Sequence, residues 1–455
     1  MISRNVLSNA RESWAKWEPT DDHPWNHRMA AHLVRRAAFG ATTDQLDRFV
    51  ELGFQDTLDA LFDRSSEQVF DEEMKPIEQV LASSQDPQQL ASWWLLRMRQ
   101  TPCQLLEKAT LFWHGHFATG AEKVQNARAM LAQNRMLREH ALGQFEPMVQ
   151  GISRDVAMLI YLDSEDNRKT RPNENYAREL MELFCLGPGN YSEEDIKEIA
   201  RCFTGWQVYR GSFRFNRYQH DRGEKSFLGQ SGNFSGEQAV RIVLDQPAAP
   251  RFLARKLIRF FVIDDVQLDD ELIGPIAEQL RETDFDMGAA IRTILESNFF
   301  YSDQAVGGKV RSPVEMAIGM LRFLDASLSM TELRGRLLTL GHLPMYPPNV
   351  KGWEGGRQWI NASTYFGRAN LVRDMVSSDD TTFAAGSVAE SLKVTESSKP
   401  ERWVGQIIDA QLAVALPDET IAQLIELASD RGTDINERVI NVITAIGATP
   451  EFQLA

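Results

Sequence analysis

Helix signals dominate this chain and constrain its fold more than any other feature. Ser235 and Ser312 each stand three residues before a Gln or Glu, the capping-box pattern that begins many helices. Thr101 has the same pattern, and Ser192 precedes an acidic first turn that suits the positive end of a helix. Amphipathic stretches with apolar residues at helical spacing follow these signals, over 103–118, 193–205, 236–245 and 313–325. The chain is therefore predicted to be mainly α.

Strand patterns are scarce. The best candidate is 206–228, where Phe213 and Phe215 alternate with Arg214 and several glycines interrupt the run, a pattern typical of a hairpin or a long irregular loop. Residues 341–361 are rich in Pro and Gly and are predicted to form a second loop. We therefore expect a large multi-helix domain with two long irregular loops and at most a small β-hairpin.

One segment has the composition of a linker. Residues 377–400 are polar and rich in Ser and Thr, and they lack the apolar residues that would offset the entropy cost of ordering. We expect this segment to be the most mobile internal part of the chain. It separates an N-terminal extension (1–25) and a main helical domain (26–376) from a C-terminal helical segment (401–455).

Composition argues against several classes of partner and compartment. The net charge of −15 disfavours a nucleic-acid ligand, which needs a basic surface. No apolar run approaches the roughly 20 residues that a membrane-spanning helix needs. Three cysteines, none in a CxxC spacing, cannot all pair, which suits a reducing compartment. The first residues contain no apolar stretch typical of an export signal, so we expect a cytoplasmic protein.

The stretch 172–187, PNENYARELMELFCLG, predicts a helix whose two faces differ in character. Pro172 suits a first helical turn, and Gly187 with the following proline predicts the end. Apolar residues share one arc, namely Tyr176, Ala177, Leu180, Met181, Leu183 and Phe184. Polar residues share the opposite arc, namely Asn175, Arg178, Glu179 and Glu182. The paired carboxylates fit two interpretations: a site that binds a metal or moves protons, and a solvated ladder in which Arg178 bridges Glu174 and Glu182.

A second candidate is the segment 112–117, FWHGHF. On a continuous helix His114 and His116 project about 200° apart, so one metal ion cannot reach both rings. If Gly115 ends the helix, both rings converge, and imidazole is a common ligand of transition metals. The alternative interpretation places one histidine in the core beside Trp113 and the other at the surface.

The 206–228 segment adds an adjacent His220 and Asp221, with Lys225 close behind. Such a pair on a loop can supply a general base or metal ligands, and it also occurs often by chance. The usual nucleophile and phosphate signatures, GxSxG, the P-loop, HExxH and a GxGxxG after a strand, do not occur in the sequence.

Aromatic residues alternate with Pro and Gly in the 341–361 loop. Tyr346, Trp353 and Trp359 offer flat apolar area at little entropy cost, which suits a platform for a sugar or a peptide. The same rings suit a plug that closes over a helical core.

Seven segments, taken in order, carry a resemblance that covers nearly the whole chain. They are HLVRRAAFG (32–40), FWHGHF (112–117), YLDSEDNRKTRPNENYARELMELFCLG (161–187), ARCFTGW (200–206), HDRGEK (220–225), KVRSPVE (309–315) and PPNVKGW (347–353). Together they resemble a large bacterial family known as domain of unknown function 1800. The resemblance implies no agreed activity. Many members look secreted, and members are often encoded beside proteins similar to the alkaline phosphatase and sulfatase superfamily, which implies a partner of that kind.

The resemblance favours a polar pocket shared by these segments and leaves two classes of function open. In the first, the chain is a metal-assisted hydrolase or a related lyase. A divalent metal would then be held by His114, His116 and His220, the catalytic candidates are Glu179, Glu182 and Asp221, and the substrate-binding candidates are Asn175, Arg178, Lys225 and Trp353. In the second, the chain is a non-catalytic accessory or scaffold of a phosphatase- or sulfatase-like partner, and its polar motifs form buried hydrogen-bonded networks.

Overall fold

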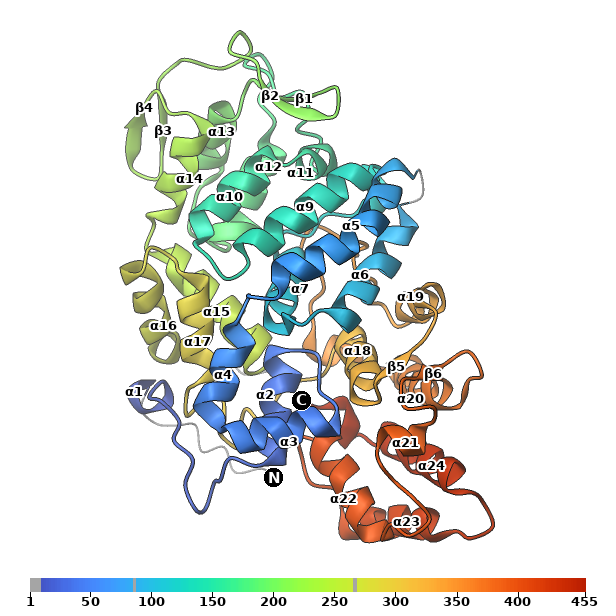
Figure 1. Cartoon of the computed structure of the whole chain (residues 1–455). Coiled ribbons are helices and arrows are strands. Elements are labelled where there is room, and N and C mark those ends of the chain that lie inside the picture. Colours follow the sequence, from blue (N-terminus) through green and yellow to red (C-terminus); the bar gives the residue numbers. More distant parts are fainter. Residues whose placement is uncertain (1–9, 85–86, 265–267) are drawn as a thin grey trace.

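The computed structural model describes residues 10–84, 87–264 and 268–455 (Figure 1). Over these residues the chain forms 24 α-helices and three two-stranded antiparallel pairs, so the prediction of a mainly α fold is confirmed. No described helix is both long enough and apolar enough to cross a membrane.

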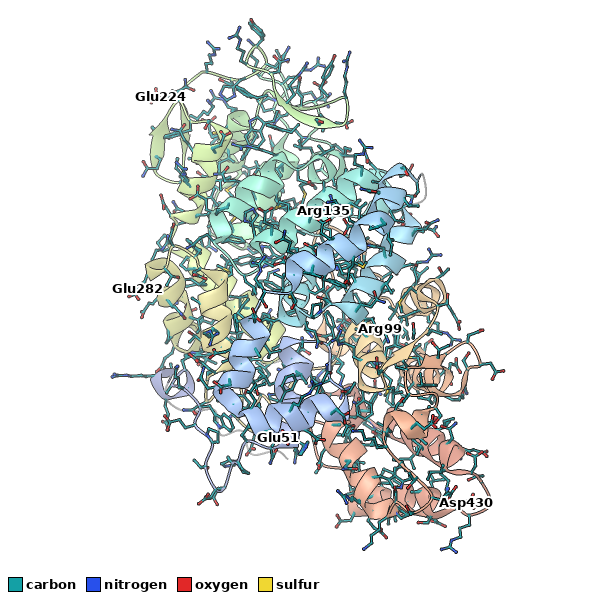
Figure 2. All side chains as sticks on the ribbon, in the orientation of Figure 1. Glu51, Arg99, Arg135, Glu224, Glu282 and Asp430 are labelled. Carbon is teal, nitrogen blue, oxygen red and sulfur yellow. The ribbon has the colours of Figure 1, made fainter. Side chains whose placement is uncertain are left out.

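Apolar side chains are buried in two hydrophobic cores, and Figure 2 shows how side chains fill the space between the helices. The first core is built by α4 (Phe54–Phe62), α10 (Phe145–Arg154), α12 (Glu174–Glu179), the π-helix η1 (Leu180–Cys185), α13 (Glu193–Cys202), α14 (Gly236–Leu244), α15 (Ala248–Phe261), α16 (Asp270–Glu282) and α17 (Met287–Leu295), with α1 (Ala10–Ser13) packed on α16.

The second core is built mainly by helices from the C-terminal part of the chain. Its elements are α3 (Thr43–Leu52), α5 (Glu67–Ser83), α6 (Gln88–Gln100), α8 (Ala121–Val124), α18 (Pro313–Phe323), α19 (Met330–Thr339), α20 (Ala362–Ser377), α21 (Val388–Ser391), α22 (Pro400–Gln411), α23 (Asp418–Ser429), α24 (Ile435–Gly447) and the short 3-10 helix η3 (Glu451–Gln453). Four helices contribute to both cores and join them, namely α2 (His27–Ala37), α7 (Gln104–His116), α9 (Ala127–His140) and α11 (Val156–Tyr161).

Helices begin at the predicted capping signals with one exception. Ser192, Ser235 and Ser312 cap α13, α14 and α18, and both hydrogen bonds of each capping box are present. At Thr101 the prediction is wrong, because α7 begins at Gln104 and the Thr101 hydroxyl accepts the N–H of the next residue but one. The Gln104 side chain, which the box would need, instead accepts the backbone N–H of Phe39.

Strands are confined to short hairpins. β1 (Trp206–Tyr209) pairs with β2 (Ser212–Phe215), and β3 (Lys225–Phe227) pairs with β4 (Gln230–Gly232). A two-residue pair joins β5 (Ala326–Ser327) to β6 (Thr382–Phe383). The segment 206–228, predicted to be one hairpin or a loop, therefore holds one complete hairpin and the first strand of a second that ends at Gly232. In Figure 1 they lie at the opposite end of the molecule from α22 and α23.

The segment predicted to be a linker carries regular structure. It contains β6 and α21, and Val388 and Ala389 of α21 are buried against α24 in the second core. A few apolar residues within this Ser/Thr-rich segment are therefore enough to pack α21 into the second core. The division of the chain at 377–400 and the mobility of this segment stay predictions.

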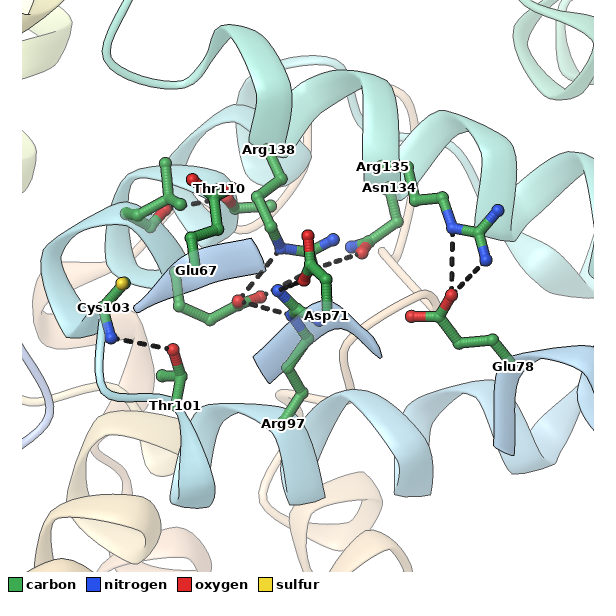
Figure 3. Close-up of polar contacts among 12 residues, drawn as sticks. Glu67, Asp71, Glu78, Arg97, Thr101, Cys103, Thr110, Asn134, Arg135 and Arg138 are labelled. Atoms are coloured by element: carbon green, nitrogen blue, oxygen red, sulfur yellow. Dashed lines mark hydrogen bonds and ion pairs between the residues drawn. The ribbon is translucent and has the colours of Figure 1, made fainter. Parts of the chain in front are cut away.

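A buried ion network holds α7 between α6 and α9 (Figure 3). Glu107 of α7 accepts hydrogen bonds from Arg97 Nε at 2.9 Å and from Arg138 Nη2 at 2.8 Å. Arg97 also pairs with Asp71 of α5. Burial favours the neutral acid, but Arg138 and Arg97 outweigh it and hold the pKa of Glu107 at about 2. The network fixes the register of the helix whose last turn carries the FWHGHF motif.

Candidate functional site

A cavity of about 500 Å³ lies where the last turns of α7 meet α15, the start of α18 and the 341–361 loop. Rings of Phe112, Phe260 and Trp353 line it beside basic, acidic and imidazole side chains. We call it the Lys256 cavity after the lysine of α15 in its wall. Its size and mixed lining suit a small organic molecule.

The 341–361 loop closes one side of the Lys256 cavity because Gly352 lets it approach α7. Gly352 has a φ of 76°, in the left-handed region, and a Cβ at this position would collide with the carbonyl oxygen of Gly115. Beyond this contact, the loop continues into the 3-10 helix η2 (Gly356–Trp359). The FWHGHF and PPNVKGW motifs, more than two hundred residues apart, are therefore direct neighbours.

His116, which lines the cavity, is held as one neutral tautomer. Its Nε2 lies 3.0 Å from the carbonyl oxygen of Phe184, so Nε2 carries the proton and Nδ1 keeps a lone pair. The residue four positions on from Phe184 is Pro188, which has no N–H to offer this carbonyl. Burial, and then the charge of Lys256, lower the pKa of His116 well below its usual value. Its Nδ1 is buried without a hydrogen-bond partner among the described residues.

Two more neutral histidines pack at the same place. His114 Nε2 accepts the backbone N–H of Met345 at 3.0 Å and so ties α7 to the loop. His342 lines the cavity, with its ring 4.7 Å from that of Trp359 in a stacked arrangement and 4.7 Å from that of Trp353 at an angle. Burial lowers the pKa of His114 and of His342 to about 3. Both histidines of FWHGHF are buried, so the interpretation that places one at the surface is wrong.

These histidines are expected to make the protein sensitive to acid. Each has a folded-state pKa below the ordinary 6.5, so between these values the unfolded chain binds protons that the folded chain excludes. Their contribution to stability is complete above pH 6.5 and is lost as the pH falls towards about 3. Urea unfolding across this range should show a falling free energy of unfolding, and His342→Gln should flatten the fall. An equally steep fall in His342→Gln would contradict this assignment.

Three of the charged groups in the cavity wall, Asp264, Lys309 and Glu315, already have partners of opposite charge. Lys309 pairs with Asp264 at 2.9 Å. Glu315 pairs with the buried Lys108 of α7 at 2.5 Å. The first pair joins the segment before α18 to the segment after α15, and the second joins α7 to α18. Neither pair involves the other cations of the wall.

Three cations line the cavity unpaired. Within the described residues, no carboxylate lies in ion-pair range of Lys256, Arg259 or Lys351. Glu354 on the loop is the one remaining acid of the lining. Burial, and then the charge of Arg259, lower the pKa of Lys256 to about 8. The cavity therefore carries excess positive charge in a chain that is acidic overall.

The helix predicted over 172–187 forms, but its winding changes from α in α12 to π in η1. Its predicted apolar arc is buried, with Leu183 only partly covered. On the polar arc Arg178 pairs with Glu193 at 2.8 Å and with Glu174 at 3.8 Å. This is the solvated ladder of the second interpretation, with Glu193 where Glu182 was expected.

The other polar residues of this helix do not line the Lys256 cavity. Glu182 accepts the Tyr191 hydroxyl at 3.1 Å, and Asn175 donates to the backbone of the preceding segment. Glu179 is half-buried, and burial and then Glu182 raise its pKa, whereas Arg178 and Lys351 lower it. Lys351, which lines the cavity, therefore interacts electrostatically with Glu179.

His220, Asp221 and Lys225 form a separate cluster that fixes the hairpins to α13. His220 Nδ1 lies 2.8 Å from the carbonyl oxygen of Thr204, and Asp221 pairs with Arg201 at 2.8 Å. Lys225 is buried, and its Nζ donates to backbone carbonyl oxygens of its own turn. The shorter of these hydrogen bonds joins Nζ to the carbonyl oxygen of Asp221 at 2.7 Å. None of these side chains lines the Lys256 cavity.

The expected metal ligands are not gathered. Across the ranges that the structure describes, no three His, Cys, Asp or Glu side chains lie close enough to hold one metal ion. The helix α7 continues through Gly115, which keeps His114 and His116 on different faces, and His220 belongs to the separate cluster.

Sequence reasoning missed Lys256, Arg259 and His342. The two cations belong to an amphipathic helix, where basic residues normally mark a solvated face. His342 lies in the 341–361 loop, for which the sequence predicted a role only for the aromatic residues. The sequence feature that pointed towards this cavity was the KVRSPVE motif, because it contains Lys309 and Glu315 of the cavity wall.

Fold and site together define a mainly α protein with a cation-lined cavity between two helices and an aromatic loop. The chain belongs to the family described as protein of unknown function (DUF1800), which matches residues 32–454 and confirms the resemblance. No curated protein and no solved structure matches the chain.

Proposed function

We propose that the protein is an enzyme that binds a small organic anion in the Lys256 cavity and moves a proton on it. The observation that carries this proposal is the set of three unpaired cations, Lys256, Arg259 and Lys351, around one cavity. Lys256 is half-buried, whereas Arg259 and Lys351 are exposed at the cavity rim. A bound anion stabilises the partly desolvated charge of Lys256, and hydrogen bonds between opposite charges are strong.

The neighbouring groups supply the other parts of such a site. Phe260 and Trp353 offer apolar area to the carbon skeleton of a ligand. His116 is the candidate proton acceptor, because it is neutral, is fixed by Phe184 and keeps a free lone pair on Nδ1. The reaction class expected from the sequence, hydrolysis or elimination, is compatible with this base.

Inorganic phosphate is expected to bind saturably, as measured by isothermal titration calorimetry. Lys256→Met and Lys351→Met should each weaken binding by roughly tenfold or more, the usual effect of losing a charged hydrogen bond. Arg255→Met is the matched control, since Arg255 lies one residue before Lys256 on α15 but does not line the cavity. Loss of binding in the control, or no saturable binding by the native protein, would contradict the proposal.

The same titration has an expected pH dependence. Lys256 is charged below its pKa of about 8 and neutral above it, so affinity for phosphate should fall as the pH rises through this value. Binding near that pH should also take up a proton, which titrations in two buffers of different ionisation enthalpy detect. Lys256→Met should remove both effects.

A second candidate is the accessory role beside a phosphatase- or sulfatase-like partner protein, which one surface favours. Tyr209, Phe215 and Tyr218 of the β1–β2 hairpin region are 46%, 50% and 69% exposed. Guanidinium groups lie over two of these rings, Arg214 over Tyr209 at 4.2 Å and Arg217 over Tyr218 at 4.9 Å. Exposed aromatic and Arg side chains are enriched in protein interfaces. Co-purification with such a partner that is lost in Tyr218→Ala and kept in Lys256→Met would favour this role.

A further inference from the structure

We infer that Lys256 is a nucleophile that forms an imine with the aldehyde or ketone group of an anionic ligand. The inference rests on the proposed anion site and names the class of ligand that it takes. Its basis is a comparison of the half-buried Lys256 with the fully buried Lys108 and Lys225.

Among the described residues, burial lowers the pKa of three lysines, Lys108, Lys225 and Lys256. Lys108 Nζ pairs with Glu315 and donates to the carbonyl oxygen of Ala38 at 3.0 Å. Both partners hold the amine in its charged form and occupy its protons. Lys108 is therefore a structural cation.

Lys225 is engaged in the same way. Its Nζ donates to the carbonyl oxygens of Asp221 at 2.7 Å and Gly223 at 3.1 Å, and to the Asn233 side chain at 3.2 Å. Three acceptors use the three protons of an ammonium group, so no lone pair is available for attack.

Lys256 differs from both. Within the described part of the chain its Nζ has no hydrogen-bond acceptor and no carboxylate partner, and it lies 5.3 Å from the centre of the Phe252 ring. Lys256 lines a cavity of about 500 Å³ together with Arg259. The positive charge of Arg259 disfavours the protonated form of Lys256. A desolvated lysine beside another cation is a general arrangement for an amine nucleophile.

The chemistry needs only the ligand as co-reactant. The neutral amine of Lys256 attacks the carbonyl carbon and forms a carbinolamine, which loses water to give the imine. Protonation of the imine restores a positive charge at Nζ, and the surrounding cations oppose that charge. A ligand that brings its own carboxylate or phosphate offsets this repulsion, so an anionic carbonyl compound fits the cavity better than a neutral one.

Reductive trapping tests the inference on the whole protein. Glyoxylate is added with cyanoborohydride, which delivers hydride to the imine carbon and leaves a carboxymethyl group on the amine. Peptide mapping should place this group on Lys256 at a rate about tenfold or more above that of the exposed Lys197, because a lower pKa leaves more of the amine neutral near neutral pH. Lys108 and Lys225 should stay unmodified, phosphate should protect Lys256, and acetaldehyde should react with it more slowly than glyoxylate.

Lys256→Arg keeps the charge and removes the nucleophile, so its phosphate affinity should persist while the adduct disappears. If phosphate binds but Lys256 reacts no faster than Lys197, the imine inference is wrong and the anion site stands. If phosphate neither binds nor protects, the proposed anion site is wrong. Equal trapping of acetaldehyde and glyoxylate would overturn the assignment of an anionic ligand.

Discussion

Replacing Glu107 by Gln is expected to lower the free energy of unfolding by about 3–5 kcal/mol, the usual cost of removing one partner from a buried ion pair. The substitution leaves Arg97 and Arg138, whose side chains are 2% and 4% exposed, without the carboxylate that they share. Urea unfolding near neutral pH measures the change.

Asp71→Asn is the matched control, because Asp71 pairs with the same Arg97 but is 48% exposed. Its expected cost is at most about 1 kcal/mol. The pKa of Glu107 is lowered on folding, so its contribution is present above the ordinary 4.5 and is lost as the pH falls through about 2. Native protein and Glu107→Gln should therefore converge in stability over this acid window, and a constant difference there would contradict the assignment.

Gly352→Ala is expected to displace the 341–361 loop and to abolish phosphate binding. A left-handed backbone costs a non-glycine residue about 1–2 kcal/mol, and overpacking against the Gly115 carbonyl adds about 1–3 kcal/mol. Lys351 and Trp353 flank this glycine, so the cavity loses a cation and an aromatic wall when the loop moves. Thermal unfolding and phosphate calorimetry on one preparation measure both effects.

Gly115→Ala tests the same contact from the other side. A Cβ on Gly115 meets nothing within 4 Å, and alanine favours a helix over glycine by up to about 1 kcal/mol. This variant should unfold at or slightly above the native temperature. If it is as destabilised as Gly352→Ala, the contact between the loop and α7 is not what holds the loop.

What could be predicted from the sequence depended on local interactions. The capping boxes at Ser192, Ser235 and Ser312 involve residues three positions apart, and all three form. The i,i+4 pair of Glu174 with Arg178 also forms. Helical periodicity likewise fixed which arc of the 172–187 helix is buried.

The cavity could not be predicted because its parts meet only through tertiary packing. Lys256 and His342 are far apart in the chain, and nothing near either residue signals the other. The two histidines of the expected metal set do not converge for a local reason, since α7 continues through Gly115 to His116. Charge counts over the whole chain also concealed a small basic site within an acidic protein.

The π-helix η1 determines which ring nitrogen of His116 carries the proton. An α-helical rewinding of Leu180–Cys185 would turn the Phe184 carbonyl relative to α7 and deprive His116 of the acceptor that keeps its proton on Nε2. The proton would then be free to move to Nδ1, and the ring would change from a proton acceptor into a proton donor towards its surroundings. The pitch of one helix thus selects which end of a neighbouring imidazole is basic.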